Sequence, residues 1–403
     1  MKKQKKNKRW RRPRHALVTW ILRVVLSPYI RFKYGARIKP LRKKRQYLVL
    51  YNHQTAFDQF FVGKAIRGTV YYLASEDLFS NGFVSKLIRF LVEPIPIKKQ
   101  TTDVRAVMNC IKVAREGGTI AIAPEGNRTY SGRTGYMNPA IIALAKKLGL
   151  PIALVRIEGG YGVHPRWSDV VRRGRIRVSV SRVIEPEEYT DMSGEQLGEL
   201  ITGGLYVDEA VADATFRHKR RAEYLERALY VCPKCGISRF FSTGSTVECT
   251  KCKLKATYTE KKELVWSSPD VRLPFVADWY AYQERYINSL DTVSLTEEPI
   301  RTDRARMSEV IVYKSKIKLA DSATLSLFGD RIEVKRDGES TVFPFDTTAA
   351  VTVLGKNKLN VYFGDKIYQF KGDKRFSALI YVNIYNRTRN LLKGEQNGQF
   401  LGL

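Results

Sequence analysis

The sequence predicts an α/β sandwich with a largely parallel sheet, followed by a small cysteine-bearing module and a β-rich C-terminal domain. Three observations lead to this prediction. Strand-like and helix-like apolar patterns alternate across residues 47–183, which is typical of strands joined by crossover helices. Two Cys-x-x-Cys pairs follow, beginning at Cys232 and Cys249. Short alternating runs typical of strands then recur across residues 309–371.

Length and composition indicate several domains and an anionic partner. The chain has 403 residues, 44% of them hydrophobic, so it can form two or three real cores. Its 70 Lys and Arg against 40 Asp and Glu give a formal net charge of +30, which suits nucleic acid or an anionic membrane. We expect a basic tail and interfacial helix over 1–40, the α/β domain over 41–225, the cysteine module over 226–262, an aromatic helical connector over 263–298, and the β-rich domain over 299–403.

The N-terminal segment combines positive charge with an apolar run. Residues 1–14 carry nine basic residues and no acid, and we expect them to be disordered when free. The run Ala16 to Ile30 is interrupted by Arg23 and Pro28, so it is too short and too charged to span a membrane. No small-residue cleavage site follows, which argues against a signal peptide. Trp10 and Trp20 with flanking cations suit a helix at a membrane interface. Packing of this helix on the α/β domain is the alternative, and the two can coexist.

The α/β region is predicted element by element from its periodicity. Strands are expected at Tyr47–Tyr51, Thr69–Ala74, Thr119–Pro124, Ile152–Ile157 and Arg175–Val183, and helices at Asn81–Val92, Asp103–Arg115, Pro139–Leu148, Gly194–Ala214 and His218–Tyr230, the last of them basic and exposed. Cys110 is interpreted as a buried small apolar residue. His164 and His218 have no motif around them and are interpreted as structural or surface residues.

Two polar motifs follow strands of this region. Asn52-His53 ends the first strand, and Asp58 stands five residues after His53, where a helix-like pattern begins. A His can take a proton from an alcohol near neutral pH, and a carboxylate on its other nitrogen fixes the tautomer and stabilises the imidazolium. The strand Thr119–Pro124 runs into the second motif, Pro124-Glu125-Gly126-Asn127-Arg128. The carboxyl ends of parallel strands are where ligands bind in open α/β sheets.

Together these motifs resemble the glycerolipid acyltransferase family that includes 1-acylglycerol-3-phosphate acyltransferase. Two looser blocks support the resemblance: Glu93 to Lys99, with its basic end, and Pro151 to Glu158, a proline opening a strand. The resemblance covers about residues 40–215. The chain departs from the family in having Asn127 where Thr or Ser is usual and Lys98-Lys99 where a single Arg is usual, which leaves acceptor selectivity open.

The resemblance implies an enzyme that transfers an acyl chain from acyl-CoA or acyl-carrier protein to a lysophospholipid, most often 1-acylglycerol 3-phosphate, to give phosphatidic acid. It implies that His53 is the general base and Asp58 its orienting partner. Substrate binding is implied for Asn52, Lys98, Lys99, Glu125, Gly126, Asn127 and Arg128. Another lysolipid acceptor is an alternative. The implied place of work is the cytosolic face of a membrane, with the protein peripheral and otherwise cytoplasmic.

The two Cys-x-x-Cys pairs predict a zinc ribbon. Thirteen residues separate Cys232 and Cys235 from Cys249 and Cys252, which is typical of two knuckles that close one tetrahedral site. Four thiolates leave no position for a water, so we expect the zinc to be structural. Two disulfides are the alternative, and the spacing and the lack of a secretory signal argue against them.

The C-terminal part predicts seven strands and one closing helix. The expected strands are Glu309–Lys314, Ala323–Leu327, Arg331–Arg336, Ser340–Phe343, Ala350–Val353, Leu359–Phe363 and Lys366–Lys371, with a helix at Phe376–Leu392. This pattern resembles a pleckstrin-homology-like domain, and another small β-barrel or roll is the alternative. Before it, Leu264–Leu290 is rich in aromatic residues with a helical second half, and Asp291–Met307 is expected to be a linker.

A zinc-ribbon nucleic-acid-binding protein is the alternative function from another class. It has the charge and the ribbon, but no recognisable base-reading module accompanies them. The sequence therefore favours an enzyme at an anionic membrane surface over a nucleic-acid partner.

Overall fold

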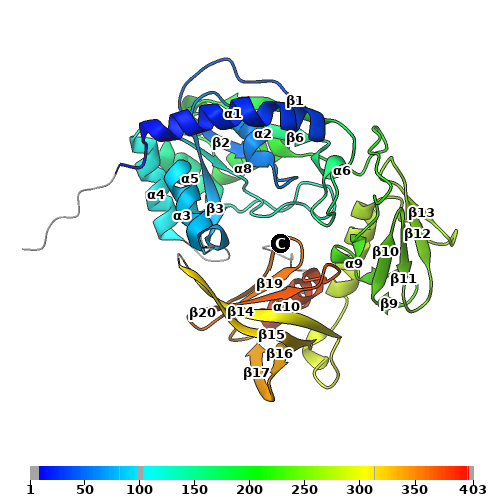
Figure 1. The fold of residues 1–403 in the computed structure, drawn as a ribbon. Coiled ribbons are helices and arrows are strands. Elements are labelled where there is room, and N and C mark those ends of the chain that lie inside the picture. Colours follow the sequence, from blue (N-terminus) through cyan, green and yellow to red (C-terminus); the bar gives the residue numbers. More distant parts are fainter. Residues whose placement is uncertain (1–8, 81, 98–102, 313, 397, 399–403) are drawn as a thin grey trace, which may run out of the picture. The chain divides into compact units, whose positions relative to one another are not determined.

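The computed structural model describes residues 9–80, 82–97, 103–312, 314–396 and 398 (Figure 1). The chain divides into two compact units. Unit 1 comprises Met1–Gly126, Thr134–Gly160 and Arg175–Val207, and unit 2 comprises Asn127–Arg133, Tyr161–Gly174 and Asp208–Leu403. The first two short pieces of unit 2 therefore come from within the predicted α/β region.

Unit 1 is built on one seven-stranded sheet in the order β1-β7-β6-β2-β5-β3-β4. The strands are β1 (Ala36–Ile38), β2 (Leu48–Tyr51), β3 (Val70–Ser75), β4 (Ile95–Ile97), β5 (Thr119–Ile122), β6 (Ile152–Glu158) and β7 (Ile176–Ile184). All neighbouring pairs are parallel except β6 and β7. The predicted largely parallel sheet is confirmed, and its central strand β2 is buried on both faces, as an apolar run without alternation predicts.

Helices cover both faces of this sheet. They are α1 (Pro13–Lys33), α2 (Asp58–Ala65), α3 (Gly82–Leu91), α4 (Val104–Arg115), α5 (Ala140–Leu148), α7 (Pro186–Tyr189) and α8 (Gly194–Leu205), with a 3-10 turn η1 at Glu76–Phe79. The short α6 (Gly160–Val163) belongs to unit 2 except for its first residue. Leu48 and Leu50 pack into one core with α4, α5 and α8. Because side chains alternate along a strand, Val49 and Tyr51 face the other side, where α2 packs with α1.

Helix α1 is packed on unit 1 through polar contacts as well as apolar ones. Arg23, the charge that interrupts the apolar run, points inward and donates to the carbonyls of Gly63 (2.7 Å) and Ile66 (2.6 Å). His15 is fully buried, with its Nδ1 3.2 Å from the Tyr71 hydroxyl. Among the described residues, no helix is long and apolar enough to cross a membrane.

One boundary in unit 1 differs from expectation. The predicted helix Gly194–Ala214 ends at Leu205. Its start is fixed by a capping box, in which Ser193 and Gln196 satisfy each other's backbone N–H groups. Beyond Leu205 the chain contacts Thr134 instead: the Thr134 N–H donates to the Val207 carbonyl, and the Val207 N–H donates to the Thr134 hydroxyl.

The N-terminal part of unit 2 is a cysteine module with a helix packed on it. Its strands are β8 (Val231–Cys232), β9 (Gly236–Ile237), β10 (Phe240–Thr243), β11 (Thr246–Cys249), β12 (Lys255–Tyr258) and β13 (Leu264–Trp266), followed by α9 (Val276–Asn288). The buried Gln283 of α9 accepts from the N–H groups of Tyr230 and Val231 and donates to the Ala228 carbonyl. Helix α9 thereby fixes the strand that carries the first cysteine.

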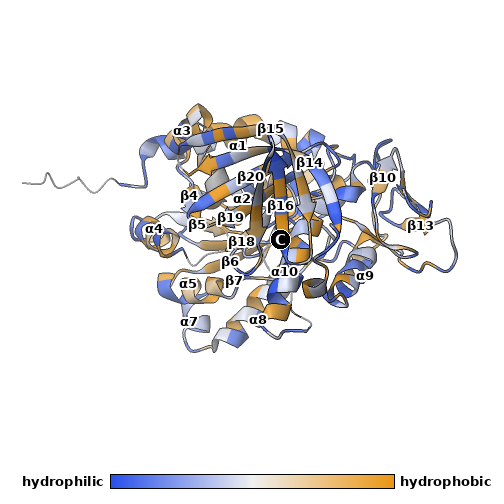
Figure 2. Cartoon of the chain, turned by 90° about the horizontal axis from the view of Figure 1, so that it is seen from below, coloured by the Kyte–Doolittle hydropathy of each residue, from blue (hydrophilic) through white to orange (hydrophobic). Residues whose placement is uncertain are grey.

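The C-terminal part of unit 2 is an antiparallel seven-stranded sheet in the order β17-β16-β15-β14-β20-β19-β18. The strands are β14 (Arg301–Ile311), β15 (Ser315–Leu327), β16 (Arg331–Arg336), β17 (Glu339–Pro344), β18 (Ala350–Leu354), β19 (Lys358–Phe363) and β20 (Lys366–Gly372), and α10 (Leu379–Leu392) closes the chain after a 3-10 turn η3 (Thr292–Ser294). Seven strands and one helix are confirmed; the pleckstrin-homology-like assignment stays a prediction. The strands of both large sheets carry many hydrophobic residues, shown in orange in Figure 2.

The predicted linker Asp291–Met307 is partly wrong, because β14 already begins at Arg301. The linker was predicted because this segment is rich in polar and charged residues. They alternate with the buried Ala305 and Met307, and Asp303 accepts hydrogen bonds from Arg239, Arg301 and Tyr381. The charges of this segment therefore belong to the sheet and its neighbours.

The predicted exposed helix His218–Tyr230 is wrong. Only Leu225–Arg227 forms a short 3-10 turn, η2, and those residues are buried. The last basic side chain of this segment, Arg227, is a buried hydrogen-bond donor rather than part of a solvated face. Arg227 donates to the Trp167 carbonyl (2.8 Å), the Asp169 carboxylate (2.7 Å) and the Lys374 carbonyl (2.7 Å).

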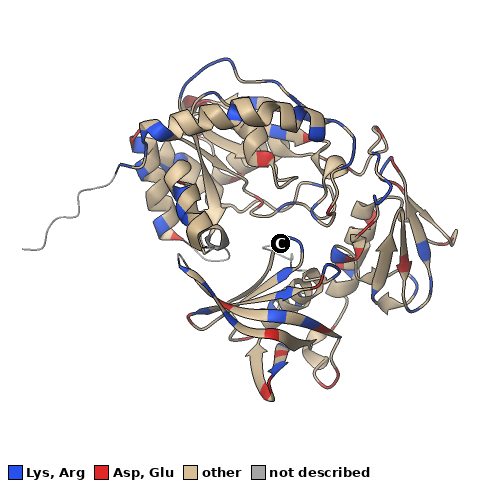
Figure 3. Cartoon of the chain, viewed as in Figure 1, with Lys and Arg blue, Asp and Glu red and all other residues tan. Residues whose placement is uncertain are grey.

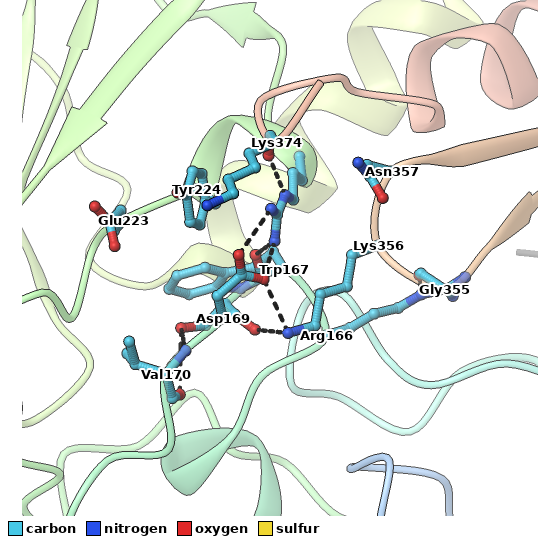
Figure 4. A network of polar contacts seen from close by, with 12 residues as sticks. Arg166, Trp167, Asp169, Val170, Glu223, Tyr224, Gly355, Lys356, Asn357 and Lys374 are labelled. Atoms are coloured by element: carbon cyan, nitrogen blue, oxygen red, sulfur yellow. Dashed lines mark hydrogen bonds and ion pairs between the residues drawn. The ribbon is translucent and has the colours of Figure 1, made fainter. Parts of the chain in front are cut away.

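The same network ties the Tyr161–Gly174 segment to the C-terminal sheet within unit 2. Lys356, in the turn between β18 and β19, donates to the Ser168 carbonyl (2.6 Å) and to Asp169 (3.0 Å), as Figure 4 shows. Burial raises the pKa of Asp169, but the hydrogen bonds from Arg227 and Lys356 outweigh it and lower the pKa to about 2. The carboxylate therefore stays ionised between its two cations.

Candidate active site

A histidine and an aspartate meet where β2 ends and α2 begins. His53 follows the strand by two residues, Asp58 is the first residue of the helix, and Nδ1 of His53 lies 2.8 Å from Oδ2 of Asp58. The His53 side chain is 24% exposed, whereas that of Asp58 is fully buried. The predicted pair is therefore within hydrogen-bonding distance, with the histidine accessible to a substrate and the carboxylate behind it.

Asp58 is held by more donors than the histidine alone. Its carboxylate accepts from the backbone N–H of Gln54 (2.7 Å), the N–H of Thr55 (2.9 Å) and the Thr55 hydroxyl (2.7 Å). The two oxygens of a carboxylate can accept several hydrogen bonds at once, so all these donors find an acceptor. When Nδ1 of His53 donates to this carboxylate, the lone pair is on Nε2, which is the form that takes a proton from a substrate.

Thr55 is a site residue that the sequence interpretation missed. Its hydroxyl donates to Asp58 and also accepts from the N–H of Phe57 (3.0 Å). A hydroxyl residue three positions before an acidic residue at a helix start is a recognisable capping-type pattern. Thr55 therefore shapes the turn that carries both His53 and Asp58.

Asn52 lies beside the pair but is turned into the sheet. It is almost fully buried, its side-chain amide donates to the Ile157 carbonyl (2.8 Å), and its oxygen accepts from the Ile157 N–H (2.7 Å). These two bonds fasten the residue before His53 to β6. In this structure Asn52 therefore positions the loop.

Glu125 contacts the backbone of the histidine. Its carboxylate accepts from the N–H of His53 (2.7 Å) and from the N–H of Gly135 (2.8 Å), so it joins two loops of unit 1. Burial raises the pKa of Glu125 to about 8, because it outweighs those two hydrogen bonds, which lower the pKa. Gly126 follows with a φ of 70°, a conformation that disfavours a side chain even though nothing else lies nearby.

The remaining predicted substrate-binding residues lie elsewhere. Asn127 and Arg128 follow Gly126 directly but belong to unit 2, where the Arg128 carbonyl accepts from Arg166 Nη1 (3.1 Å). Arg166 also donates to the carbonyls of Gly355 and Val353. Arg128 is therefore held to the turn after β18. Lys98 and Lys99 lie outside the described residues.

The other histidines and the isolated cysteine have structural surroundings. His164 is buried in unit 2, and burial, then the charges of Lys356 and Arg128, lower its pKa to about 3. His218 Nδ1 accepts from the N–H of Arg220 (3.0 Å). Cys110 is fully buried, and burial raises its pKa to about 12. The structural interpretation of all three is confirmed.

The four predicted metal ligands come together in unit 2. The sulfur atoms of Cys232, Cys235, Cys249 and Cys252 all lie within 4.8 Å of one another. Pairs of them are 3.5 Å and 3.6 Å apart. Thiolates bound to zinc at 2.3 Å in a tetrahedron stand about 3.8 Å apart, so this cluster fits a metal of that kind. Cys232 and Cys249 are buried and Cys235 and Cys252 half-buried, which suits a closed structural site.

Comparison with known proteins agrees with this geometry. Residues 36–158 match the family model described as Acyltransferase. The chain carries an acyltransferase domain. The acyltransferase prediction made from His53, Asp58 and the Pro124–Arg128 motif is confirmed. These residues lie in unit 1 except for Asn127 and Arg128, which lie in unit 2.

The acyltransferase domain has curated relatives in plants. The 1-acyl-sn-glycerol-3-phosphate acyltransferase BAT2, chloroplastic, of Brassica napus is 25% identical over 93 residues, which is 22% of this chain and 27% of the relative. The 1-acyl-sn-glycerol-3-phosphate acyltransferase LPAT1, chloroplastic, of Arabidopsis thaliana is 24% identical over 93 residues, 22% of this chain and 26% of the relative. The chain thus spans about a quarter of the length of the curated relatives it matches.

The chain also has matches among solved structures. The crystal structure of the 1-acyl-sn-glycerophosphate (LPA) acyltransferase PlsC from Thermotoga maritima aligns with a TM-score of 0.36 and 18% sequence identity. The alignment covers 47% of this chain and 92% of that chain.

Proposed function

We propose that this protein transfers an acyl chain from acyl-CoA or acyl-carrier protein to the free hydroxyl of a lysophospholipid, with 1-acylglycerol 3-phosphate as the acceptor and phosphatidic acid as the product. The single observation that supports this best is the hydrogen-bonded His53–Asp58 pair inside the matched domain. The names of the plant relatives supply the acceptor class. The histidine is accessible and the aspartate is not, as a base with a buried orienting partner requires.

In this mechanism Nε2 of His53 takes the proton of the acceptor hydroxyl as that oxygen attacks the thioester carbonyl. The tetrahedral intermediate collapses, the carbon–sulfur bond breaks, and the imidazolium returns the proton to the departing thiolate. Asp58 keeps Nδ1 protonated and stabilises the imidazolium. Glu125 holds the His53 backbone, and Thr55 holds Asp58, so the base needs little rearrangement.

Arg128 is proposed to bind the acceptor phosphate, together with Lys98 or Lys99. A guanidinium binds a phosphate through two parallel hydrogen bonds, which a neutral acceptor would not use. Arg128→Ala should therefore impair transfer to 1-acylglycerol 3-phosphate much more than transfer to a monoacylglycerol.

The test is an acceptor panel with purified full-length protein and acyl-CoA, with thiol release and lipid products measured by mass spectrometry. The expected result is phosphatidic acid from 1-acylglycerol 3-phosphate, and an Arg128→Ala variant that discriminates less between phosphorylated and neutral acceptors. Equal loss on both acceptors would argue against the phosphate-binding role. If the protein acylates only another lysolipid, that lysolipid is the acceptor instead of 1-acylglycerol 3-phosphate.

We also propose that the protein works on an anionic membrane at its cytosolic face. Helix α1 buries His15 and Ile30 but exposes a stripe of large apolar side chains at helical spacing: Leu17, Trp20, Ile21, Val24, Val25, Tyr29 and Phe32. Phe32 is 82% exposed. No acidic residue occurs on this helix, and basic residues flank the stripe (Figure 3). An apolar face with flanking cations is typical of a helix that lies in a membrane interface.

Deleting residues 1–14 tests the electrostatic part of this attachment. Each Lys or Arg near an anionic surface contributes about 1 kcal/mol, and salt screens it. We expect the full-length protein to lose part of its vesicle binding as salt rises, and the truncated protein to respond much less. Turnover on detergent-dispersed substrate should stay nearly unchanged. Identical salt curves for both proteins, with an electrophoretic shift of nucleic acid, would favour the nucleic-acid alternative.

The four cysteines are proposed to hold a structural zinc. All four ligand positions are filled by thiolates, so the metal would stabilise the module.

A further inference from the structure

Unit 1 has a pocket of about 500 Å³ apart from the His53 loop. Its walls are Ser27, Ile30 and Arg31 of α1, the whole of β1, and Lys64 near the end of α2. Asp58 lies at the other end of α2, roughly 9 Å away along the helix axis at 1.5 Å per residue. The pocket is therefore separate from the catalytic pair.

The pocket walls carry three cations and no acid. Arg31, Arg37 and Lys64 line it, and the other lining residues are apolar except for the Ser27 hydroxyl. Arg31 and Arg37 are exposed, and within the described residues neither forms an ion pair. The neighbour of Arg37 in the sheet is another cation, Arg177, whose charge is paired with Glu158 at 3.2 Å.

The Lys64 ammonium contacts the pocket wall rather than the carbonyls of its own helix. Arg23 donates to the carbonyl of Gly63 in α2 and to those of Ile66 and Gly68 just after the helix. The Lys64 ammonium instead donates to the Ser27 hydroxyl, which in turn donates to the Arg23 carbonyl. This chain of contacts holds the ammonium against the Ser27 wall of the pocket.

The pocket combines this charge with apolar surface. Ile30 and Ala36 form buried apolar wall, and Tyr29 and Phe32 of the exposed apolar stripe flank Ile30 and Arg31 along α1. A ligand with a phosphate among the cations would thus have apolar surface beside it for acyl chains. Pockets of 300–1,000 Å³ accept molecules larger than a phosphate ion.

We propose that this pocket binds the head group of an anionic phospholipid, with its phosphate between Arg31, Arg37 and Lys64. Guanidinium groups bind phosphate oxygens through two hydrogen bonds, and the ammonium adds a point charge. The lipid bound here is a membrane component rather than the acyl acceptor, so the site does not depend on the proposed acyl transfer. Its occupation would fix α1 at one depth and orientation on the membrane.

The test uses dihexanoyl phosphatidylglycerol below its micelle concentration, because it is neither substrate nor product of the proposed reaction. Binding is measured by calorimetry on full-length protein carrying His53→Ala, which excludes turnover. Dihexanoyl phosphatidylcholine and inorganic phosphate are the comparison ligands. The pocket variant is Arg31→Gln/Arg37→Gln, and the matched control is Arg105→Gln/Lys147→Gln, two exposed cations of α4 and α5 with the same change in net charge.

We expect the anionic lipid to bind the parent and the control alike, and the pocket variant at least about tenfold more weakly. The zwitterionic lipid and inorganic phosphate should bind more weakly than the anionic lipid. Equal weakening in both variants would overturn the proposal, as would no measurable binding to the parent. If inorganic phosphate binds as tightly as the lipid, the pocket is a site for a free anion, and the lipid proposal is overturned. If the double variant unfolds at a lower temperature than the parent, the single variant Lys64→Gln is used in its place and should also bind the anionic lipid more weakly than the parent.

Discussion

Replacing Asp58 by Asn tests the orienting carboxylate, because the change removes one charge and one acceptor but keeps the shape. Four donors converge on the carboxylate: His53 Nδ1, the N–H groups of Gln54 and Thr55, and the Thr55 hydroxyl. Whichever oxygen becomes an amide nitrogen, it will face at least two donors. A hydrogen bond to a charged group contributes about 1.5–3 kcal/mol, so the loss of two predicts a decrease of about 3–6 kcal/mol in the free energy of unfolding.

The rate should fall further than stability alone explains. An amide facing Nδ1 with its N–H group would favour the opposite tautomer of His53, in which Nε2 carries the proton and cannot accept one. The expected decrease is roughly 10²–10⁴-fold, the usual contribution of a general base. Thiol release from acyl-CoA with 1-acylglycerol 3-phosphate measures the rate, and urea unfolding measures the stability.

Asp103→Asn is the matched control, since it makes the same atomic change at another helix start of unit 1. Asp103 accepts from the N–H of Ala106 at the start of α4. Asn caps helices nearly as well as Asp, so we expect less than about 1 kcal/mol of destabilisation and no change in rate. A folded Asp58→Asn protein with a rate within threefold of the parent would refute the role of the carboxylate.

Three further predictions concern groups outside the pair. Glu125→Gln should slow transfer, because an amide nitrogen cannot accept from the N–H of His53 or Gly135. Because the pKa of this carboxyl is about 8 in the folded protein and about 4.5 when unfolded, the parent should lose stability as pH rises from about 4.5 to 8. Glu125→Gln should abolish that loss, as measured by urea unfolding. Burial and then the charge of Arg14 lower the pKa of His15 to about 4, so the parent should lose stability as pH falls from about 6.5 to 4, by at most about 1.4 kcal/mol per pH unit, and His15→Phe should flatten that slope. Cys232→Ser should remove one zinc per chain and destabilise unit 2, since structural zinc contributes on the order of 10–16 kcal/mol of apparent binding energy in small fingers; carefully purified parent protein without zinc would contradict this.

The features that were predicted correctly depend on residues that are close together in the sequence or on regularly recurring apolar runs. His53 and Asp58 are separated by one turn, so their meeting needs no tertiary information beyond a strand that ends and a helix that begins. The Cys-x-x-Cys knuckles likewise define their own geometry. The C-terminal apolar runs are distinct enough that seven strands were predicted, although the first was expected from Glu309 and begins at Arg301.

The features that could not be predicted depend on distant partners. Arg227 reads as a solvated helix residue, yet it is buried against the carbonyls of Trp167 and Lys374, which are 60 and 147 positions away. Glu125 is 72 positions from the His53 N–H that it accepts from. Arg23 reads as a break in an apolar run, but its partners are the carbonyls that end α2. Local periodicity carries no signal for such long-range polar contacts.

The most direct measurement of the central claim is the rate of phosphatidic acid formation by the full-length protein and by His53→Ala, with His218→Ala as the control histidine. His218 is a half-buried histidine of unit 2 whose Nδ1 accepts from its own loop. We predict a roughly 10²–10⁴-fold loss for His53→Ala with an unchanged unfolding temperature, and no loss for His218→Ala. Near-parental turnover by folded His53→Ala protein would contradict the account.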